Sequence, residues 1–180
     1  MAGSGAMTKS AKPKCKNKGF TLIELLVVTG IIVLFTALVL ANYRLGEKQL
    51  GLQRAAHQLA QDLRRSQEMA LSSQKINGQV PRGYGVYLNK NQAFQYILFA
   101  DLDANQRYSG PSEKVEEKTL EGIVRISQLL PELDSALTIT FVPPDPSVVF
   151  YPDAAAAFIT LSVEETKTIQ VNKAGLIAIE

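Results

Sequence analysis

The feature that most constrains this chain is an apolar run from Phe20 to Ala41 that contains a single carboxylate, Glu24. The 22 residues of the run span about 33 Å as a helix at ~1.5 Å per residue, which matches the hydrocarbon core of a bilayer. We therefore predict a membrane-spanning helix over residues 20–41. Five lysines and no acid precede the run. By the positive-inside tendency, they place the N-terminus in the cytoplasm and the rest of the chain outside.

A secretory signal peptide and a plain signal anchor are the alternative interpretations of the run. It is longer than the ~15 residues of a signal-peptide apolar region, and no A-x-A-like cleavage site follows it. A signal anchor explains everything except Glu24, because an ionised carboxylate inside a membrane costs roughly 2.5 kcal/mol or more unless it is paired. The run contains no Lys, Arg or His. The partner of Glu24 is therefore expected on another chain, and an α-amino group freed by cleavage just before the run would serve.

The stretch "GFTLIELLVV", with the lysine-rich segment before it, resembles the class III signal of type IV pilins and type II secretion pseudopilins. The resemblance implies that residues 1–19 are a leader, removed by prepilin peptidase between Gly19 and Phe20. It also implies that Phe20 becomes N-methylated and that Glu24 neutralises the N-terminal amine of a neighbouring subunit. The implied partners are prepilin peptidase, other pilins or pseudopilins and an inner-membrane assembly platform. The chain would be a single-pass inner-membrane protein before it enters a pilus or pseudopilus.

An amphipathic helix is predicted to continue the apolar run over residues 42–73. Its apolar positions follow steps of four and three, which is a stripe of about 3.5-residue period. The stripe consists of Leu52, Ala56, Leu59, Leu63, Ser66 and Ala70. We predict one helix from about Thr21 to Ser73, whose second half packs on a sheet. His57, the only histidine, lies beside the stripe, where we expect a solvated position.

Residues 74–180 read as a β-rich domain, because the apolar pattern changes to a period of two. "YGVYLN" and "AFQYILFAD" form a predicted hairpin around "NKNQ", and seven further strand candidates follow, most of them separated by turn residues. Strands this closely spaced indicate antiparallel pairing. The predicted fold class is α+β, a long N-terminal helix packed on an antiparallel β-rich domain, as in pilins.

This body resembles the GspH/FimT-type minor pseudopilin domain. The resemblance rests on the order of elements, on the loop "FADLDANQRY" and on the closing "IQVNKAGLIAIE". Major pilins commonly carry a proline near the end of the apolar run, whereas this chain reads "LANYRLG" there. That difference favours a minor subunit.

Asp101, Asp103 and Asn105 have the spacing that begins a calcium loop. The rest of that pattern is missing, because Gln106 stands where the loop needs glycine, and its final glutamate, Glu113, comes one place late. The alternative is a polar hairpin loop whose Asp and Asn side chains bond to turn backbone. The residues favour this alternative, and calcium is the one cofactor that they suggest.

We predict a structural subunit and no enzyme. The only cysteine, Cys15, lies in the leader, so it cannot form a nucleophile–base pair with His57, and no catalytic motif is present. The alternative function is a DNA-binding minor pilin that acts in DNA uptake. Without the five leader lysines, 14 basic residues stand against 17 acidic ones, and Lys173 is the single cation of the final segment. This balance opposes phosphate binding.

Overall fold

The computed structural model describes residues 19–76, 78–143 and 147–180. The predicted leader therefore lies outside the described residues, apart from Gly19. The chain divides into two units, residues 1–42 and 43–180, which we describe separately. The helix α1, Leu22–Leu71, contributes residues to both.

The first unit contains the apolar part of α1. Its span Leu22–Leu40 is 19 residues of helix, long and apolar enough to cross a membrane by length and composition. All described side chains of this span are exposed to solvent within the isolated chain. An apolar helix with no buried face needs lipid or other helices around it.

In the second unit, the rest of α1 packs its predicted stripe into the core. All six residues of the stripe are buried, and Ala55, Ala60, Asp62 and Met69 widen it. His57 is exposed, as expected. After the helix, Ser73 adopts a positive φ of 48°, and the N–H of Gln74 donates to the carbonyl of Met69 at 3.2 Å. This arrangement satisfies carbonyls that the helix end would leave free.

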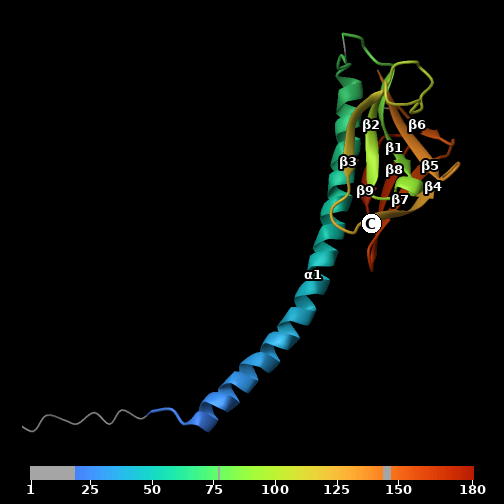
Figure 1. Cartoon of the computed structure of the whole chain (residues 1–180). Coiled ribbons are helices and arrows are strands. Elements are labelled where there is room, and N and C mark those ends of the chain that lie inside the picture. Colours follow the sequence, from blue (N-terminus) through green and yellow to red (C-terminus); the bar gives the residue numbers. More distant parts are fainter. Residues whose placement is uncertain (1–18, 77, 144–146) are drawn as a thin grey trace, which may run out of the picture. The chain divides into compact units, whose positions relative to one another are not determined.

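Two antiparallel sheets make up the rest of the unit, beside the C-terminal part of α1 (Figure 1). The five-stranded sheet has the order β3-β2-β1-β5-β6. Its strands are β1 (Gly83–Asn89), β2 (Gln95–Asp101), β3 (Lys114–Thr119), β5 (Ala136–Val142) and β6 (Ser147–Tyr151). The four-stranded sheet has the order β4-β7-β8-β9. Its strands are β4 (Arg125–Leu130), β7 (Ala156–Ser162), β8 (Thr166–Asn172) and β9 (Ile177–Ile179).

The predicted hairpin is present between β1 and β2. A 3₁₀ turn, η1 (Lys90–Gln92), joins the strands, and Asn89 caps it by accepting a hydrogen bond from the N–H of Asn91 at 2.8 Å. Alternate residues of β1 and its neighbours point into one core with the helix stripe. The predicted α+β fold class, a long helix with antiparallel sheets, is confirmed.

Gly85 in β1 marks the tightest packing on the opposite face of the five-stranded sheet. A Cβ atom there would lie 2.2 Å from the carbonyl oxygen of Ile139 and 2.7 Å from Cε1 of Phe99. Only glycine fits at such a close approach. The aromatic ring of Phe99 therefore takes the space that a side chain at position 85 would fill, on the face that carries the loop after β2.

Candidate functional site

The N-terminal end of α1 is organised by Thr21 and Glu24. Thr21 precedes the first helical residue, and its Oγ1 accepts a hydrogen bond from the N–H of Glu24 at 3.3 Å. Its carbonyl accepts from the N–H of Leu25 at 3.2 Å. Thr21 is thus the N-cap, and Glu24 lies in the first turn, where free N–H groups favour a negative charge.

Glu24 stands apart from the other polar residues of the span Leu22–Leu40. The hydroxyl of Thr29 donates to the carbonyls of Leu25 and Leu26, and that of Thr36 donates to the carbonyl of Ile32 at 2.7 Å. Both threonines are therefore satisfied within their own helix. Within the described part of the chain, the carboxylate of Glu24 has no such partner.

Gly19 and Phe20 lie just before the helix, outside regular structure. The ring of Phe20 is 82% exposed, and no heavy atom comes within 4 Å of the position of a Cβ on Gly19. Within the part of the chain that the structure describes, nothing packs at the Gly19 end of this bond. Cleavage at this bond and methylation of Phe20 remain predictions.

The loop between β2 and β3 brings together Asp101, Asp103 and Glu113. One carboxylate oxygen from each lies within 4.8 Å of the others, and Asp101 and Glu113 are buried. Asn105, predicted as a third ligand, also contacts the cluster: its Nδ2 donates to Oδ2 of Asp103 at 2.8 Å, while its Oδ1 accepts from the N–H of Arg107 at 2.7 Å. Glu113, which comes one place late for the calcium-loop pattern, joins the two aspartates as a third carboxylate.

Each of these carboxylates already accepts hydrogen bonds from the loop. Asp101 accepts from the N–H groups of Asn105 and Gln106, and Asp103 accepts from the hydroxyl of Ser109 at 3.0 Å. Glu113 accepts from the N–H of Ser109 at 2.8 Å and from that of Leu102. The carboxylates hold the turn closed, and the same oxygens are the ligand type that calcium prefers.

The pKa values of the two aspartates move in opposite directions. Burial raises the pKa of Asp101, against the lowering effect of the N–H donors of Gln106 and Asn105. Partial desolvation raises that of Asp103, but hydrogen bonds from Ser109 and Asn105 outweigh it and hold its pKa below the ordinary value. Of these two aspartates, Asp101 therefore takes up a proton first.

The same loop folds back over the outer face of the five-stranded sheet. Tyr108 packs on Tyr87 and Phe99, with ring centroids 5.0 and 5.8 Å away. The guanidinium of Arg107 lies 4.3 Å from the ring centroid of Tyr151. Thr140 donates to the carbonyl of Gln106 at 2.9 Å. The loop is thereby fixed to β1, β2, β5 and β6.

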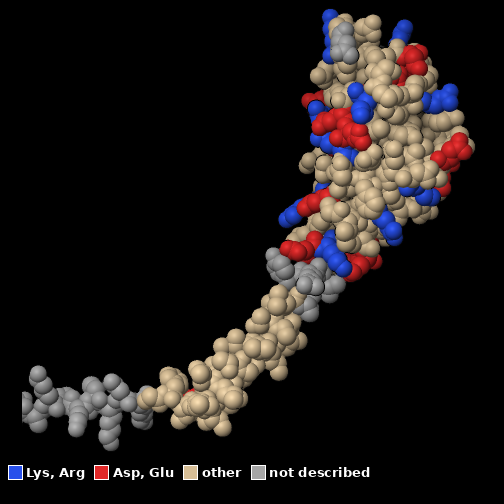
Figure 2. Space-filling model, viewed as in Figure 1, with Lys and Arg blue, Asp and Glu red and all other residues tan. Residues whose placement is uncertain are grey.

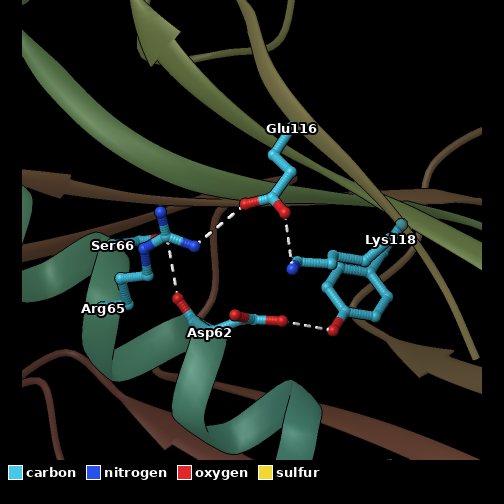
Figure 3. A network of polar contacts seen from close by, with 6 residues as sticks. Asp62, Arg65, Ser66, Glu116 and Lys118 are labelled. Atoms are coloured by element: carbon cyan, nitrogen blue, oxygen red, sulfur yellow. Dashed lines mark hydrogen bonds and ion pairs between the residues drawn. The ribbon is translucent and has the colours of Figure 1, made fainter.

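A polar network joins α1 to β2 and β3 (Figure 3). Tyr96 donates to Oδ2 of Asp62 at 2.5 Å, and Glu116 pairs with Arg65 at 2.9 Å and with Lys118 at 2.5 Å. The hydrogen bond from Lys118 lowers the pKa of Glu116, against partial desolvation, and Arg65 adds to the effect. The two acids and the two bases of the network balance in charge, and they come from both α1 and β3. The network therefore holds the helix against the sheet.

A comparison with known families gives one match. The family described as the prokaryotic N-terminal methylation motif matches residues 14–40. Comparisons with curated proteins and with solved structures give no match. The matched segment includes Gly19, Phe20 and Glu24, and it contains the apolar start of α1. The motif implies processing by prepilin peptidase and assembly with other pilins, and it favours a structural subunit over an enzyme.

Proposed function

We propose that this type IV pilin-like chain is a minor pilin or pseudopilin, a structural subunit of a type IV pilus or a type II secretion-like filament. It is inserted with its N-terminus in the cytoplasm and its β-rich unit outside. Prepilin peptidase cleaves it between Gly19 and Phe20, and Phe20 is methylated. An inner-membrane assembly platform then adds it to the filament.

The observation that carries this proposal is the state of Glu24. It lies in the first turn of the exposed apolar span Leu22–Leu40, whose threonines are satisfied internally. After cleavage, the amine of Phe20 on a neighbouring subunit is a cation that a shift of about one helical turn brings level with Glu24. Two unit charges about 4 Å apart attract by about 4 kcal/mol at an effective dielectric constant of 20, which offsets desolvation of the carboxylate. The pair would set the stagger between adjacent helices.

The experiment compares processing with assembly. Glu24→Ala is expected to be cleaved normally and to be depleted from sheared filaments, while it stays in the membrane fraction. Glu47→Ala is the control, because Glu47 is an exposed acid of the same helix outside the apolar span. Normal incorporation of the Glu24 variant would count against the pairing.

A second variant tests processing alone. Gly19→Leu should block cleavage and leave the larger precursor on a blot. Mass spectrometry of membrane-extracted wild-type protein should find an N-terminal N-methylated Phe20. An intact leader in cells with active peptidase would overturn the assignment.

DNA binding during uptake is the alternative function. Three of its candidate cations are paired with acids: Arg54 with Glu121, Arg65 with Glu116 and Lys173 with Asp153. Basic and acidic side chains are interspersed on the face of the second unit that Figure 2 presents. These pairs favour the filament role, because phosphate binding needs clustered free cations. A salt-dependent gel shift would reverse this preference.

A further inference from the structure

Two tyrosines and a threonine form a row across the outer face of the five-stranded sheet. In the strand register, Tyr87 of β1 is opposite Thr138 of β5, and Thr138 is opposite Tyr151 of β6. With strands about 4.8 Å apart, the backbones of the two tyrosines are about 10 Å from each other. The side chain between them, Thr138, is small and buried, so the surface is lower there than at the two tyrosines.

This row is the floor of a groove of about 400 Å³. One side is formed by Arg107 and Tyr108, which the loop after β2 presses against Tyr151 and Tyr87. The other side is the hairpin turn before β5, where Asp134 holds a positive φ of 52°. The complete lining is Tyr87, Asn89, Arg107, Tyr108, Leu133, Asp134, Ala136, Thr138 and Tyr151.

The lining offers both donors and acceptors without net charge. Among the described lining residues, Arg107 is the one cation and Asp134 the one anion. Asn89 donates to the hydroxyl of Tyr87 at 3.0 Å, which leaves the hydroxyl proton of Tyr87 free to donate in turn. Aromatic walls with a few placed polar groups are typical of small-ligand sites.

We propose that this groove binds a neutral saccharide. The tyrosine ring faces that Arg107 and Tyr108 leave uncovered would contact the apolar C–H face of a sugar ring. The hydroxyls of the sugar would accept hydrogen bonds from Asn89 and Arg107 and donate to Asp134. The site is independent of assembly through Glu24, so it extends the filament role and does not depend on it.

Two other ligand classes fit the lining less well. A nucleic acid needs an excess of cations for its phosphates, and here the charge of Arg107 is balanced by Asp134. A proline-rich peptide can dock on aromatic grooves, but its prolines offer only carbonyl acceptors. Such a peptide would use the aromatic walls, while the exposed carboxylate of Asp134 would stay bonded to water. A sugar hydroxyl both donates and accepts, and it can pair with the cation, the anion and the amide.

The test is saturation-transfer NMR on the full chain in dodecylphosphocholine micelles, because this detergent has no sugar headgroup. The probes are maltohexaose, cellohexaose and mannohexaose at millimolar concentration. We expect saturable transfer to at least one of them. Tyr151→Ala should weaken that binding about tenfold, the loss of one aromatic contact of about 1.4 kcal/mol. Tyr151→Phe, which keeps the ring, should stay within about threefold of wild type.

Phe94→Ala is the matched control, because Phe94 is an aromatic residue, 52% exposed, that does not line the groove. It should bind like wild type. Thermal melting checks that each variant folds. If Tyr151→Ala does not fold, Arg107→Ala takes its place, and it should also weaken binding. Absence of transfer from all three probes would overturn the proposal. The proposal would also be overturned if the folded groove variants bound the sugars as tightly as wild type. Binding of a proline-rich peptide or an oligonucleotide in place of the sugars would overturn it as well.

Discussion

The hydroxyl of Tyr96 donates a hydrogen bond to Oδ2 of Asp62 at 2.5 Å, and both residues are buried. Burial and the bond to Asp62 raise the pKa of Tyr96 well above its ordinary value, so the hydroxyl keeps its proton. The pair joins β2 to α1 beneath the surface network of Glu116. Like the hydrogen bond from the hydroxyl of Ser66 to the carbonyl of Asp62, it is shielded from solvent on both sides.

Tyr96→Phe should therefore lower the free energy of unfolding by about 1–3 kcal/mol, because the buried carboxylate of Asp62 loses its partner. Denaturant unfolding of the full chain in micelles measures this change. Tyr151→Phe is the control, since the Tyr151 side chain is partly exposed, and it should shift stability by less than about 0.5 kcal/mol. An unchanged midpoint for Tyr96→Phe would show that water satisfies Asp62 instead.

Two glycine substitutions should have opposite effects. Gly85→Ala places a methyl group 2.2 Å from a backbone oxygen, so the sheet must shift, and we expect a loss of about 3 kcal/mol or more. At Gly51 in α1 a Cβ would meet nothing within 4 Å, so Gly51→Ala should stabilise the helix by about 0.5–1 kcal/mol. Thermal melting followed by circular dichroism compares the two. A tolerated Gly85→Ala would contradict the close approach of Phe99.

The contribution of Glu116 should disappear in acid. Its folded-state pKa is lowered by Lys118 and Arg65, so its stabilising effect is present above the unfolded pKa, about 4.5. The effect is lost as the pH falls through the lower folded value. Glu116→Gln should be less stable than wild type at pH 7 by about 0.2–1 kcal/mol, as for exposed ion pairs, and the difference should close in acid. A difference that is constant across pH would mean that packing, not charge, is responsible.

Calcium should leave the melting temperature unchanged if the carboxylates of Asp101, Asp103 and Glu113 serve the loop alone. We expect this result, because their oxygens already accept hydrogen bonds from the backbone and from Ser109. The measurement is a melting curve with calcium and then with a chelator, with magnesium as the control. A rise with calcium that the chelator removes would instead establish a metal site, since a bound ligand stabilises the folded state.

Glu113→Gln provides the second arm of the same experiment. In a loop held by its own hydrogen bonds, the amide keeps only one of the two acceptor oxygens, so one backbone N–H loses its partner. The free energy of unfolding should then fall by about 1–3 kcal/mol, with or without calcium. In a metal site, the substitution would remove a charged ligand and abolish the calcium response.

The sequence alone predicted the elements whose signals are local. The apolar run with Glu24 predicted a membrane-length helix, and the stripe from Leu52 to Ala70 predicted the buried face of its continuation. Both predictions succeed because helix periodicity places neighbours in sequence on one face. The hairpin around residues 90–92 was equally local, since polar turn residues separate two strands.

Only the tertiary structure decided what meets across the sheets. Glu113 joins Asp101 and Asp103 because the strand pairing of β2 and β3 returns the chain to the same point. Tyr87 and Tyr151 come to flank Thr138 through the pairing of β5 with both β1 and β6. Such contacts depend on strand order and register, which are set by the packing of the whole core and leave no local trace in the sequence.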